Sequence, residues 1–276
     1  MIKDTRQSEL VAAVFTKNEA ANIGECIESL AGISAITVID SNSTDGTQLL
    51  AKQRGASVIN FEWNGSYPRK KQWTLNHLSE ADWVLMMDAD LRAHPELIAE
   101  LKVKIQDKSL SAILIPIDYW FRGKRLKFGV KVKYFGVLKP NMVKFPDVEI
   151  EGDGYGDIEF HYQPRVSGMI VTSQNRIIHR DNDPIASWVE RHNKYAAYQA
   201  RINSNKKNKK IMDRNKTFQG KLFSKIPFKS LFFFMFSYFV LGGFFDGKRG
   251  FQYNYLLAHH YYLQSIYRED SSCIKN

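Results

Sequence analysis

The chain has 276 residues, of which 44% are hydrophobic and 25% charged, a composition that supports a buried core and excludes wholesale disorder. Its two cysteines cannot build a disulfide framework, which indicates a reducing compartment, and the first ten residues lack the apolar segment of a secretory signal. The net charge is +10, but residues 1–200 carry 25 basic and 25 acidic groups, so the excess lies in residues 201–276. A neutral body with a basic tail predicts that the tail meets an anionic surface.

Apolar runs of strand length alternate with helical patterns along the first 120 residues. The pattern predicts strands over residues 10–16, 35–40, 57–61, 83–87 and 112–117. It predicts helices starting near Asn22 and Pro95, and over residues 43–54 and 69–78. Such alternation is typical of right-handed βαβ units, so we expect an α/β fold with a mostly parallel sheet and helices on both faces.

The periodicity weakens after residue 118, and segments of distinct composition follow. Residues 122–139 are basic and contain aromatic side chains, residues 149–159 are acidic and rich in glycine, and residues 183–202 have the pattern of an amphipathic helix. Residues 230–245 contain no charge. As one helix they would extend about 24 Å, short of the ~30 Å hydrocarbon core of a bilayer. We therefore expect an interfacial or re-entrant helix with basic flanks, and the alternative is a buried core or dimer helix.

Polar residues follow three of the predicted strands, at positions 16–19, 40–47 and 88–90. In an open parallel sheet, ligands bind at the carboxyl ends of the strands. Two carboxylates directly after a buried strand, as at Asp88 and Asp90, favour a Mg²⁺ or Mn²⁺ site completed by phosphate oxygens. In isolation such a pair indicates a solvated loop, and residues 43–45 also suit a helix cap.

These segments, taken in order, resemble the nucleotide-binding half of the family 2 glycosyltransferases, which have the GT-A fold. The motifs that carry the resemblance are TKNEAANIGECIESL, VIDSNSTDGT, RKKQW and WVLMMDAD. The most similar type is the bacterial β-glycosyltransferases of lipopolysaccharide-core and exopolysaccharide synthesis, whose C-terminal parts resemble HRDNDPIASWVERHNKYAAYQA and GGFFDGKRGFQYN.

The resemblance implies a catalytic GT-A domain over residues 1–200, with a nucleotide-sugar half over about 8–120 and an acceptor half over about 121–200. Residues 201–276 would then be a helical, membrane-associating extension.

By position, the resemblance implies that Thr16, Asn18 and Glu19 line the nucleotide pocket and that Asp40 hydrogen-bonds the base. Many relatives carry a second acid where this chain has Ser41. The choice of nucleotide therefore stays open, with UDP favoured.

The resemblance also implies the residues around the diphosphate. Lys70 or Lys71 would approach it, and Asp88 and Asp90 would form the Asp-x-Asp pair, with Asp90 as the direct metal ligand. His179 is a candidate to complete the metal or diphosphate site, against the alternative that it is a structural histidine.

A base that takes the proton of the acceptor hydroxyl is required for inversion at the anomeric carbon. Asp157 and Glu159 share this assignment, which rests on the resemblance. Without the resemblance to the family, the composition of residues 149–159 indicates an acidic surface loop. In the helical pattern that follows, we expect Trp188 to be a packing residue, while the roles of Arg191 and His192 stay open.

The leading expectation is an inverting, metal-dependent hexosyltransferase that uses a nucleotide-sugar and acts on a saccharide or lipid-linked acceptor. It would work at the cytoplasmic face of a bacterial inner membrane as a peripheral or monotopic protein. A sugar-nucleotide-processing nucleotidyltransferase is the alternative, although that class would carry a basic, Gly-rich phosphate loop after the first strand. A nucleic-acid binder using the basic tail is a weaker alternative because the body is neutral and no recognised motif is present, so we expect no nucleic-acid partner.

Overall fold

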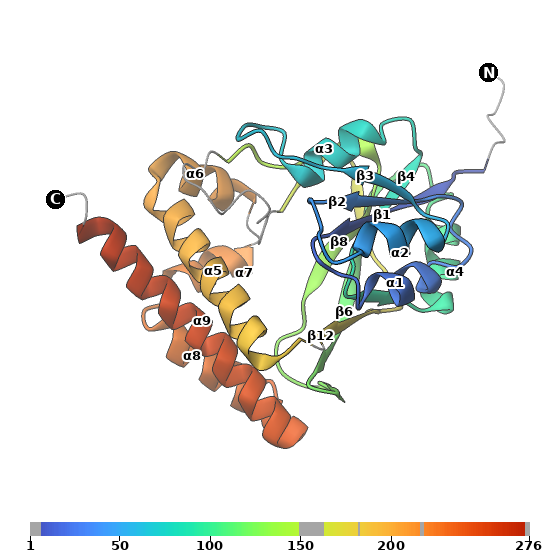
Figure 1. Cartoon of the computed structure of the whole chain (residues 1–276). Coiled ribbons are helices and arrows are strands. Elements are labelled where there is room, and N and C mark those ends of the chain that lie inside the picture. The colour runs from blue at the N-terminus through green and yellow to red at the C-terminus, as the bar shows by residue number, and fades with distance from the viewer. Residues whose placement is uncertain (1–6, 149–162, 182, 216–217, 274–276) are drawn as a thin grey trace.

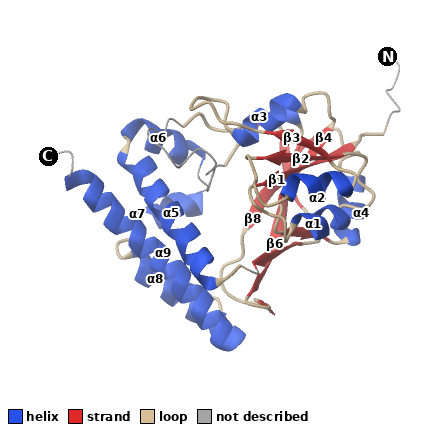
Figure 2. Cartoon of the chain, in the orientation of Figure 1, coloured by secondary structure: helices blue, strands red, loops and turns tan. Residues whose placement is uncertain are grey.

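A large mixed sheet and a layer of C-terminal helices make up the molecule (Figure 1). The computed structural model describes residues 7–148, 163–181, 183–215 and 218–273. Figure 2 shows that the strands and helices α1–α4 form one side of the molecule, while helices α5–α9 form the other.

The strands are β1 Leu10–Thr16, β2 Ile36–Asp40, β3 Ser57–Asn60, β4 Trp83–Asp88, β5 Leu91–Ala93, β6 Leu110–Phe121, β7 Lys124–Arg125, β8 Lys133–Leu138, β9 Val143–Lys144, β10 Arg165–Val166, β11 Met169–Thr172 and β12 Ile177–Asp181. The α-helices are α1 Ile23–Ser29, α2 Thr47–Gln53, α3 Lys70–His77, α4 Pro95–Lys104, α5 Ile185–Ser204, α6 Lys206–Asn215, α7 Phe218–Lys225, α8 Lys229–Met235 and α9 Gly247–Cys273. Short helical turns are η1 Pro140–Met142, η2 Phe236–Val240 and η3 Gly243–Asp246.

The main sheet has the strand order β3-β2-β1-β4-β8-β6-β12-β5, with β7 and β11 also paired to β6. Strands β3, β2, β1 and β4 are mutually parallel, whereas β8 runs antiparallel to both β4 and β6. The α/β class and the mostly parallel first half agree with the sequence prediction. Apart from the apolar run before His179, the strands after residue 118 were not predicted, because they are short or lack a clear alternation.

Apolar residues cover both faces of the sheet, as expected for strands that are apolar on both sides. On one face, Ile23 of α1 and Leu97 of α4 pack in the same cluster as the strands. On the other face, Leu75 of α3 and Tyr198 of α5 belong to a second cluster. Burial of these two clusters fixes the sheet between helices and leaves the strand ends free to form a site.

Helix α2 begins at Thr47, four residues later than predicted. The intervening loop contains Asn42 and Gly46 at φ of 58° and 90°, a left-handed backbone that a helix does not accommodate. Residues 41–46 therefore form a loop that lies at the carboxyl end of β2.

The single helix expected over residues 230–245 is broken in the structure. Helix α8 ends at Met235, a π-helical turn follows, and Gly242 has φ of 72°. At Gly243 a Cβ atom would lie 2.9 Å from the carbonyl oxygen of Ser237, so only glycine allows this close approach. No single helix in the described part of the chain is long and apolar enough to cross a membrane, but the segments 229–240 and 243–270 meet that criterion together, with a bend of 74°.

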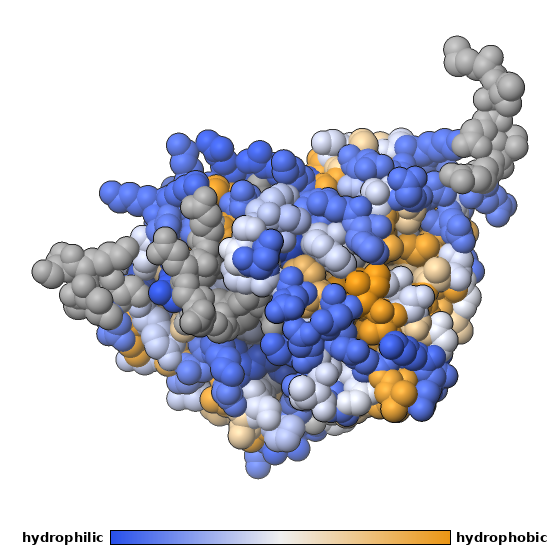
Figure 3. Space-filling view, turned by 45° about the horizontal axis from the view of Figure 1, so that its top comes forward, coloured by the Kyte–Doolittle hydropathy of each residue, from blue (hydrophilic) through white to orange (hydrophobic). Residues whose placement is uncertain are grey.

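Helix α9 packs along α5, so that the C-terminal helices form one layer (Figure 1). The Tyr267 hydroxyl donates to Asn193 Oδ1 at 2.6 Å, and His260 Nδ1 lies 3.0 Å from the carbonyl oxygen of His192. Trp188 is buried against Phe121, which confirms the predicted packing role. On the face in Figure 3, hydrophilic residues cover most of the surface and hydrophobic ones form small separate groups.

Candidate active site

Three neighbouring parallel strands bring predicted site residues to one edge of the sheet. Strands β2, β1 and β4 are adjacent, and their register pairs Thr16 with Asp40 and Phe15 with Asp88. Because the carboxyl ends of parallel strands meet at the same edge, Thr16, Asp40 and Asp88 lie where open α/β sheets bind ligands.

Asp40 is fully buried, and its carboxylate accepts hydrogen bonds on both oxygens. Oδ1 accepts from the hydroxyls of Thr16 and Ser43, and Oδ2 accepts from the Ser43 amide and the Gln48 side chain. Although burial opposes ionisation, these bonds hold the pKa of Asp40 below its ordinary value. Because a carboxylate has about four acceptor sites, the predicted bond from Asp40 to a base requires one of these donors to move.

The loop after β1 is fastened to the loop after β2 through Asn18. The Asn18 amide donates to Ser43 Oγ at 2.8 Å, and its side-chain oxygen accepts from the Thr44 amide at 2.9 Å. Asp45 accepts the Thr47 amide at 3.1 Å, so it shapes the turn before α2. The segment 43–45 thus serves both as a turn and as a support for the first loop.

Glu19 lies in the same loop and is partly buried. Its Oε2 accepts from the side chain of Asn22 at 2.8 Å. Burial raises the pKa of Glu19 to about 7, and the negative charges of Asp90 and Asp183 add to this effect. At neutral pH, Glu19 therefore carries a proton much of the time and can donate a hydrogen bond to an anionic ligand.

The structure distinguishes the two lysines that the sequence left as alternatives. Lys70 is buried, and its Nζ donates to Ser41 Oγ at 2.6 Å and to the carbonyl oxygen of Thr16 at 3.3 Å. The charges of both lysines favour the ionised form of Asp88, and that of Lys71 has the larger effect. Lys70 therefore supports the ends of β1 and β2 in addition to its effect on Asp88, whereas Lys71 acts on the acidic pair.

Asp88, Asp90 and His179 meet through a strand pairing that joins distant parts of the chain. Strand β5 pairs with β12, which sets Leu91 opposite His179 and leaves His179 Nε2 3.1 Å from Asp90 Oδ2. Against the effect of burial, His179 holds the pKa of Asp90 below its ordinary value. Although the Asp88 side chain is exposed at the end of β4, desolvation by the protein around it and the neighbouring Asp90 charge raise its pKa. The two carboxyl groups therefore differ in their readiness to carry negative charge, and Asp90 is the stronger acid.

The predicted base residues, Asp157 and Glu159, lie outside the described residues. Their assignment stays a prediction. Strand β12, which follows that segment in the chain, contacts the acidic pair through His179.

The family model described as glycosyl transferase family 2 matches residues 12–152, about half of the chain. The chain belongs to this family. The expected GT-A fold is confirmed by this membership together with the parallel sheet described above.

Several curated relatives are similar to this family 2 glycosyltransferase. An uncharacterised glycosyltransferase of Rickettsia typhi is 28% identical over 247 residues, which cover 86% of this chain and 79% of the relative. One of Rickettsia felis is 40% identical over 95 residues, about a third of each chain. The lipopolysaccharide core biosynthesis glycosyltransferase LpsC of Rhizobium meliloti is 39% identical over 100 residues, which cover 33% of this chain and 36% of LpsC. The chain thus spans only about a third of the length of some of these relatives.

Solved structures include a more distant likeness. Glucosyl-3-phosphoglycerate synthase of Mycobacterium tuberculosis, in complex with Mn²⁺, uridine diphosphate and phosphoglyceric acid, is 16% identical. The alignment covers 70% of this chain and 78% of the synthase, with a TM-score of 0.42.

The acidic pair of this family 2 glycosyltransferase fits a divalent cation. Among the residues that the structure describes, none forms a hydrogen bond with the buried Asp90 Oδ1, so this carboxylate oxygen is left for a ligand. In the described ranges, no three His, Cys, Asp or Glu side chains converge into a preformed metal-binding group. Mg²⁺ commonly takes only one or two protein carboxylates and completes its shell with phosphate oxygens and water. The arrangement therefore suits a cation that arrives with a diphosphate.

The sequence does not assign a role to Arg191, and the structure places its positive charge near Asp90 and Glu19. It forms an ion pair with Asp183, and its positive charge lowers the pKa of both Asp90 and Glu19. Tyr119 was missed altogether; its ring lies 5.2 Å from that of His179. The sequence signal for Arg191 was its place in the predicted amphipathic helix 183–202, which closely follows His179.

Proposed function

We propose that this chain is an inverting hexosyltransferase that moves a sugar from a nucleoside-diphosphate sugar, with UDP favoured, to a saccharide or lipid-linked acceptor. The observation that supports the proposal best is the acidic pair Asp88 and Asp90 at the carboxyl edge of the sheet, with His179 Nε2 3.1 Å from Asp90 and the charge of Lys71 acting on Asp88. Family membership supports the reaction class. Lipopolysaccharide core or exopolysaccharide is the proposed acceptor class, and the local similarity to LpsC supports it.

The leaving group is a diphosphate, whose negative charge must be stabilised as the glycosidic bond breaks. In the proposal, Asp90 and Asp88 hold Mg²⁺ or Mn²⁺, which when bound supplies Lewis-acid stabilisation of the diphosphate. Lys71 and Arg191 add positive charge near the same carboxylates. His179 orients Asp90 through the 3.1 Å contact, so that the second oxygen of Asp90 faces the ligand.

The remaining residues of the edge organise the nucleotide pocket. In the proposal, the hydrogen bonds of Asp40 hold the ends of β1 and β2 together as one wall of the pocket. Lys70 supports that wall by donating to Ser41. Glu19, when protonated, donates a hydrogen bond toward the phosphates. Asp157 or Glu159 takes the proton of the acceptor hydroxyl on the side opposite the diphosphate, which inverts the anomeric carbon.

The proposed location is the cytoplasmic face of a bacterial inner membrane, with the protein peripheral or monotopic. The basic charge of residues 201–276 supports this location, because cytoplasmic leaflets are anionic. We likewise propose that residues 1–200 are the catalytic unit and residues 201–276 the extension.

A nucleotide-release assay tests the proposal. The purified full chain is incubated with a panel of UDP- and GDP-sugars, a lipid-linked acceptor extract, and Mn²⁺, Mg²⁺ or EDTA. We expect metal-dependent release of one nucleoside diphosphate, loss of that release in Asp90→Asn, and normal release in the control Asp107→Asn, an exposed turn carboxylate. Equal release in Asp90→Asn and wild type, or release of pyrophosphate instead, would overturn it.

A further inference from the structure

Large apolar side chains are exposed along the broken helix pair formed by α8, η2, η3 and α9. We call this surface the aromatic face, and it includes Leu231, Phe239, Val240, Phe245, Phe251 and Tyr255. Leu231 is 63% exposed and Val240 70% exposed. Exposed apolar residues that recur every three or four positions lie on one side of a helix, so the pattern is a face rather than scattered residues.

Ring contacts make the aromatic face continuous across the break between the helices. The ring of Tyr238 lies 5.0 Å from that of Phe239, 6.2 Å from that of Phe244 and 5.7 Å from that of Phe251. Phe251 in turn stacks on Tyr255 at 5.9 Å. One patch therefore joins η2, η3 and the start of α9.

Phe228, immediately before α8, is an exposed phenylalanine whose side chain and backbone conformation are not stabilised by the fold. It is 84% exposed and has φ of 48°, a left-handed backbone in which a bulky residue is strained. Neither packing nor local backbone preference favours phenylalanine there. An external apolar contact would account for it.

The charges around the aromatic face are almost all positive. Between residues 218 and 268 the sequence contains one acidic residue, Asp246, and it is buried. The exposed Lys221 and Lys225 precede α8, and the exposed Lys248 follows the break. Apolar side chains flanked by cations complement an anionic interface whose interior is apolar, which is the chemistry of an acidic lipid leaflet.

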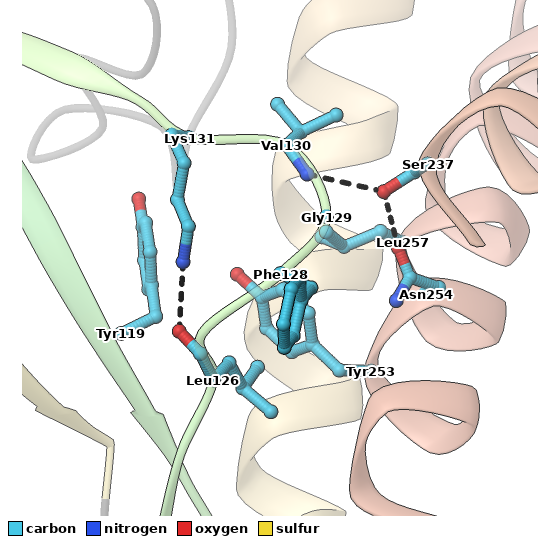
Figure 4. Close-up of a pocket in the computed structure, with 10 residues that line it drawn as sticks. All are labelled: Tyr119, Leu126, Phe128, Gly129, Val130, Lys131, Ser237, Tyr253, Asn254 and Leu257. Atoms are coloured by element: carbon cyan, nitrogen blue, oxygen red, sulfur yellow. Dashed lines mark hydrogen bonds between the residues drawn. The ribbon is translucent and has the colours of Figure 1, made fainter. Parts of the chain in front are cut away.

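Hydrogen bonds join the aromatic face to a loop of the sheet half of the molecule. Asp246 accepts hydrogen bonds from the amides of Lys127 and Phe128, at 3.0 and 2.9 Å. Figure 4 shows the next part of the same loop, where the amide of Val130 donates to Ser237 Oγ. These bonds tie the break between the helices to the loop that follows β7.

Aromatic contacts lead from helix α9 to the acidic pair. The ring of Tyr253, two positions from Phe251 and so on the opposite side of α9, is 6.0 Å from that of Tyr119. The Tyr119 ring is 5.2 Å from that of His179. Helix α9 therefore carries exposed rings on one side and contacts the surroundings of the candidate metal site on the other.

We propose that the aromatic face docks on the anionic surface of a lipid bilayer and inserts its side chains to the depth of the headgroups. The 74° bend and the one-sided exposure suit a surface-bound unit that enters one leaflet. This inference deepens the proposed function, because it would bring the site to a membrane-borne acceptor, but the binding itself requires neither donor nor acceptor.

Vesicle flotation of the full chain tests the proposal. The probes are vesicles of phosphatidylcholine alone and of phosphatidylcholine with 30% phosphatidylglycerol, at low and at high salt. We expect wild type to float with the anionic vesicles and to be partly released by high salt. The double variant Leu231→Ser/Val240→Ser should lose at least about tenfold in vesicle affinity, the factor that corresponds to about 1.4 kcal/mol.

The chain offers a matched control for this variant. Leu49 in α2 and Val103 in α4 are 61% and 74% exposed, close to the values for Leu231 and Val240. Leu49→Ser/Val103→Ser should bind vesicles as wild type does. Circular dichroism and thermal unfolding of both variants exclude loss of fold as the cause.

Each other outcome would overturn the proposal. Wild type that stays unbound to anionic vesicles, or a control pair that loses binding equally, would show that the aromatic face has no special affinity for lipid. A dimeric wild type that becomes monomeric in Leu231→Ser/Val240→Ser, with no vesicle binding, would identify the occupant as a second copy. Nucleotide release, measured in parallel without vesicles, reports on the proposed function separately.

Discussion

Replacing Asp246 should release the loop that follows β7 from the C-terminal helices. The Asp246 side chain is buried and accepts the amides of Lys127 and Phe128 at 3.0 and 2.9 Å. Hydrogen bonds to a charged group contribute about 1.5–3 kcal/mol each, and buried donors left without a partner are costly. Allowing for water that enters the space, we expect Asp246→Ala to lower the free energy of unfolding by about 2–4 kcal/mol.

The effect should be local as well as global. Hydrogen exchange should accelerate first at the amides of Lys127, Phe128 and Val130, since these donate directly to Asp246 or to Ser237 beside it. Ser237→Ala is a milder comparison, because it removes only neutral hydrogen bonds, one from the Val130 amide and one to Asn254 Oδ1, and should lower the free energy of unfolding by about 1–2 kcal/mol.

Urea unfolding and amide exchange by mass spectrometry would measure both quantities. A loss below about 0.5 kcal/mol in Asp246→Ala, with unchanged exchange in residues 127–130, would refute the reasoning. Such a result would mean that other contacts, such as the packing of Tyr198 of α5 in the second apolar cluster of the sheet, hold the helices in place.

Three further predictions concern the edge of the sheet and helix α5. Asp90→Asn should lower turnover by at least about 10²-fold with little change in thermal stability, because it removes a proposed ligand and no core contact; full activity in EDTA would contradict this. Lys71→Met should raise the KM for the donor about tenfold. Lys70→Met should mainly lower the free energy of unfolding, by about 1–3 kcal/mol, because Lys70 is buried between two acceptors. If both variants changed KM and stability equally, the distinction between the two lysines would be wrong. Burial lowers the pKa of His192 from 6.5 to about 3, so the stability that depends on its neutral form is complete above pH 6.5 and is lost as the pH falls toward 3. We expect the free energy of unfolding in urea to fall between pH 7 and pH 5 by about 1 kcal/mol more in wild type than in His192→Phe, after allowance for the partial exposure of His192. The control His94→Gln, at an exposed histidine, should behave as wild type.

Local sequence determined the first half of the fold and the position of the acidic pair. The apolar run before Asp88 has the length of a strand and is apolar on both faces, so it indicates a buried strand. The register of that strand in the parallel sheet places Asp88 at the carboxyl edge, beside Thr16 and Asp40. These features depend on contacts between neighbouring βαβ units, whose handedness and connection length are strongly restricted.

Tertiary structure decided which distant residues join that edge and how the C-terminal segment folds. His179 reaches Asp90 only because β12 pairs with β5, across almost ninety positions of sequence, and no local pattern encodes that pairing. Asp40 satisfies its acceptors with protein donors from two loops, which its position after a strand does not reveal. The uncharged segment 230–245 has the composition of one helix, but Gly243 must approach the Ser237 carbonyl while α9 packs against α5. That packing breaks the helix, because close contact between segments far apart in the chain outweighs the helical preference of each segment alone.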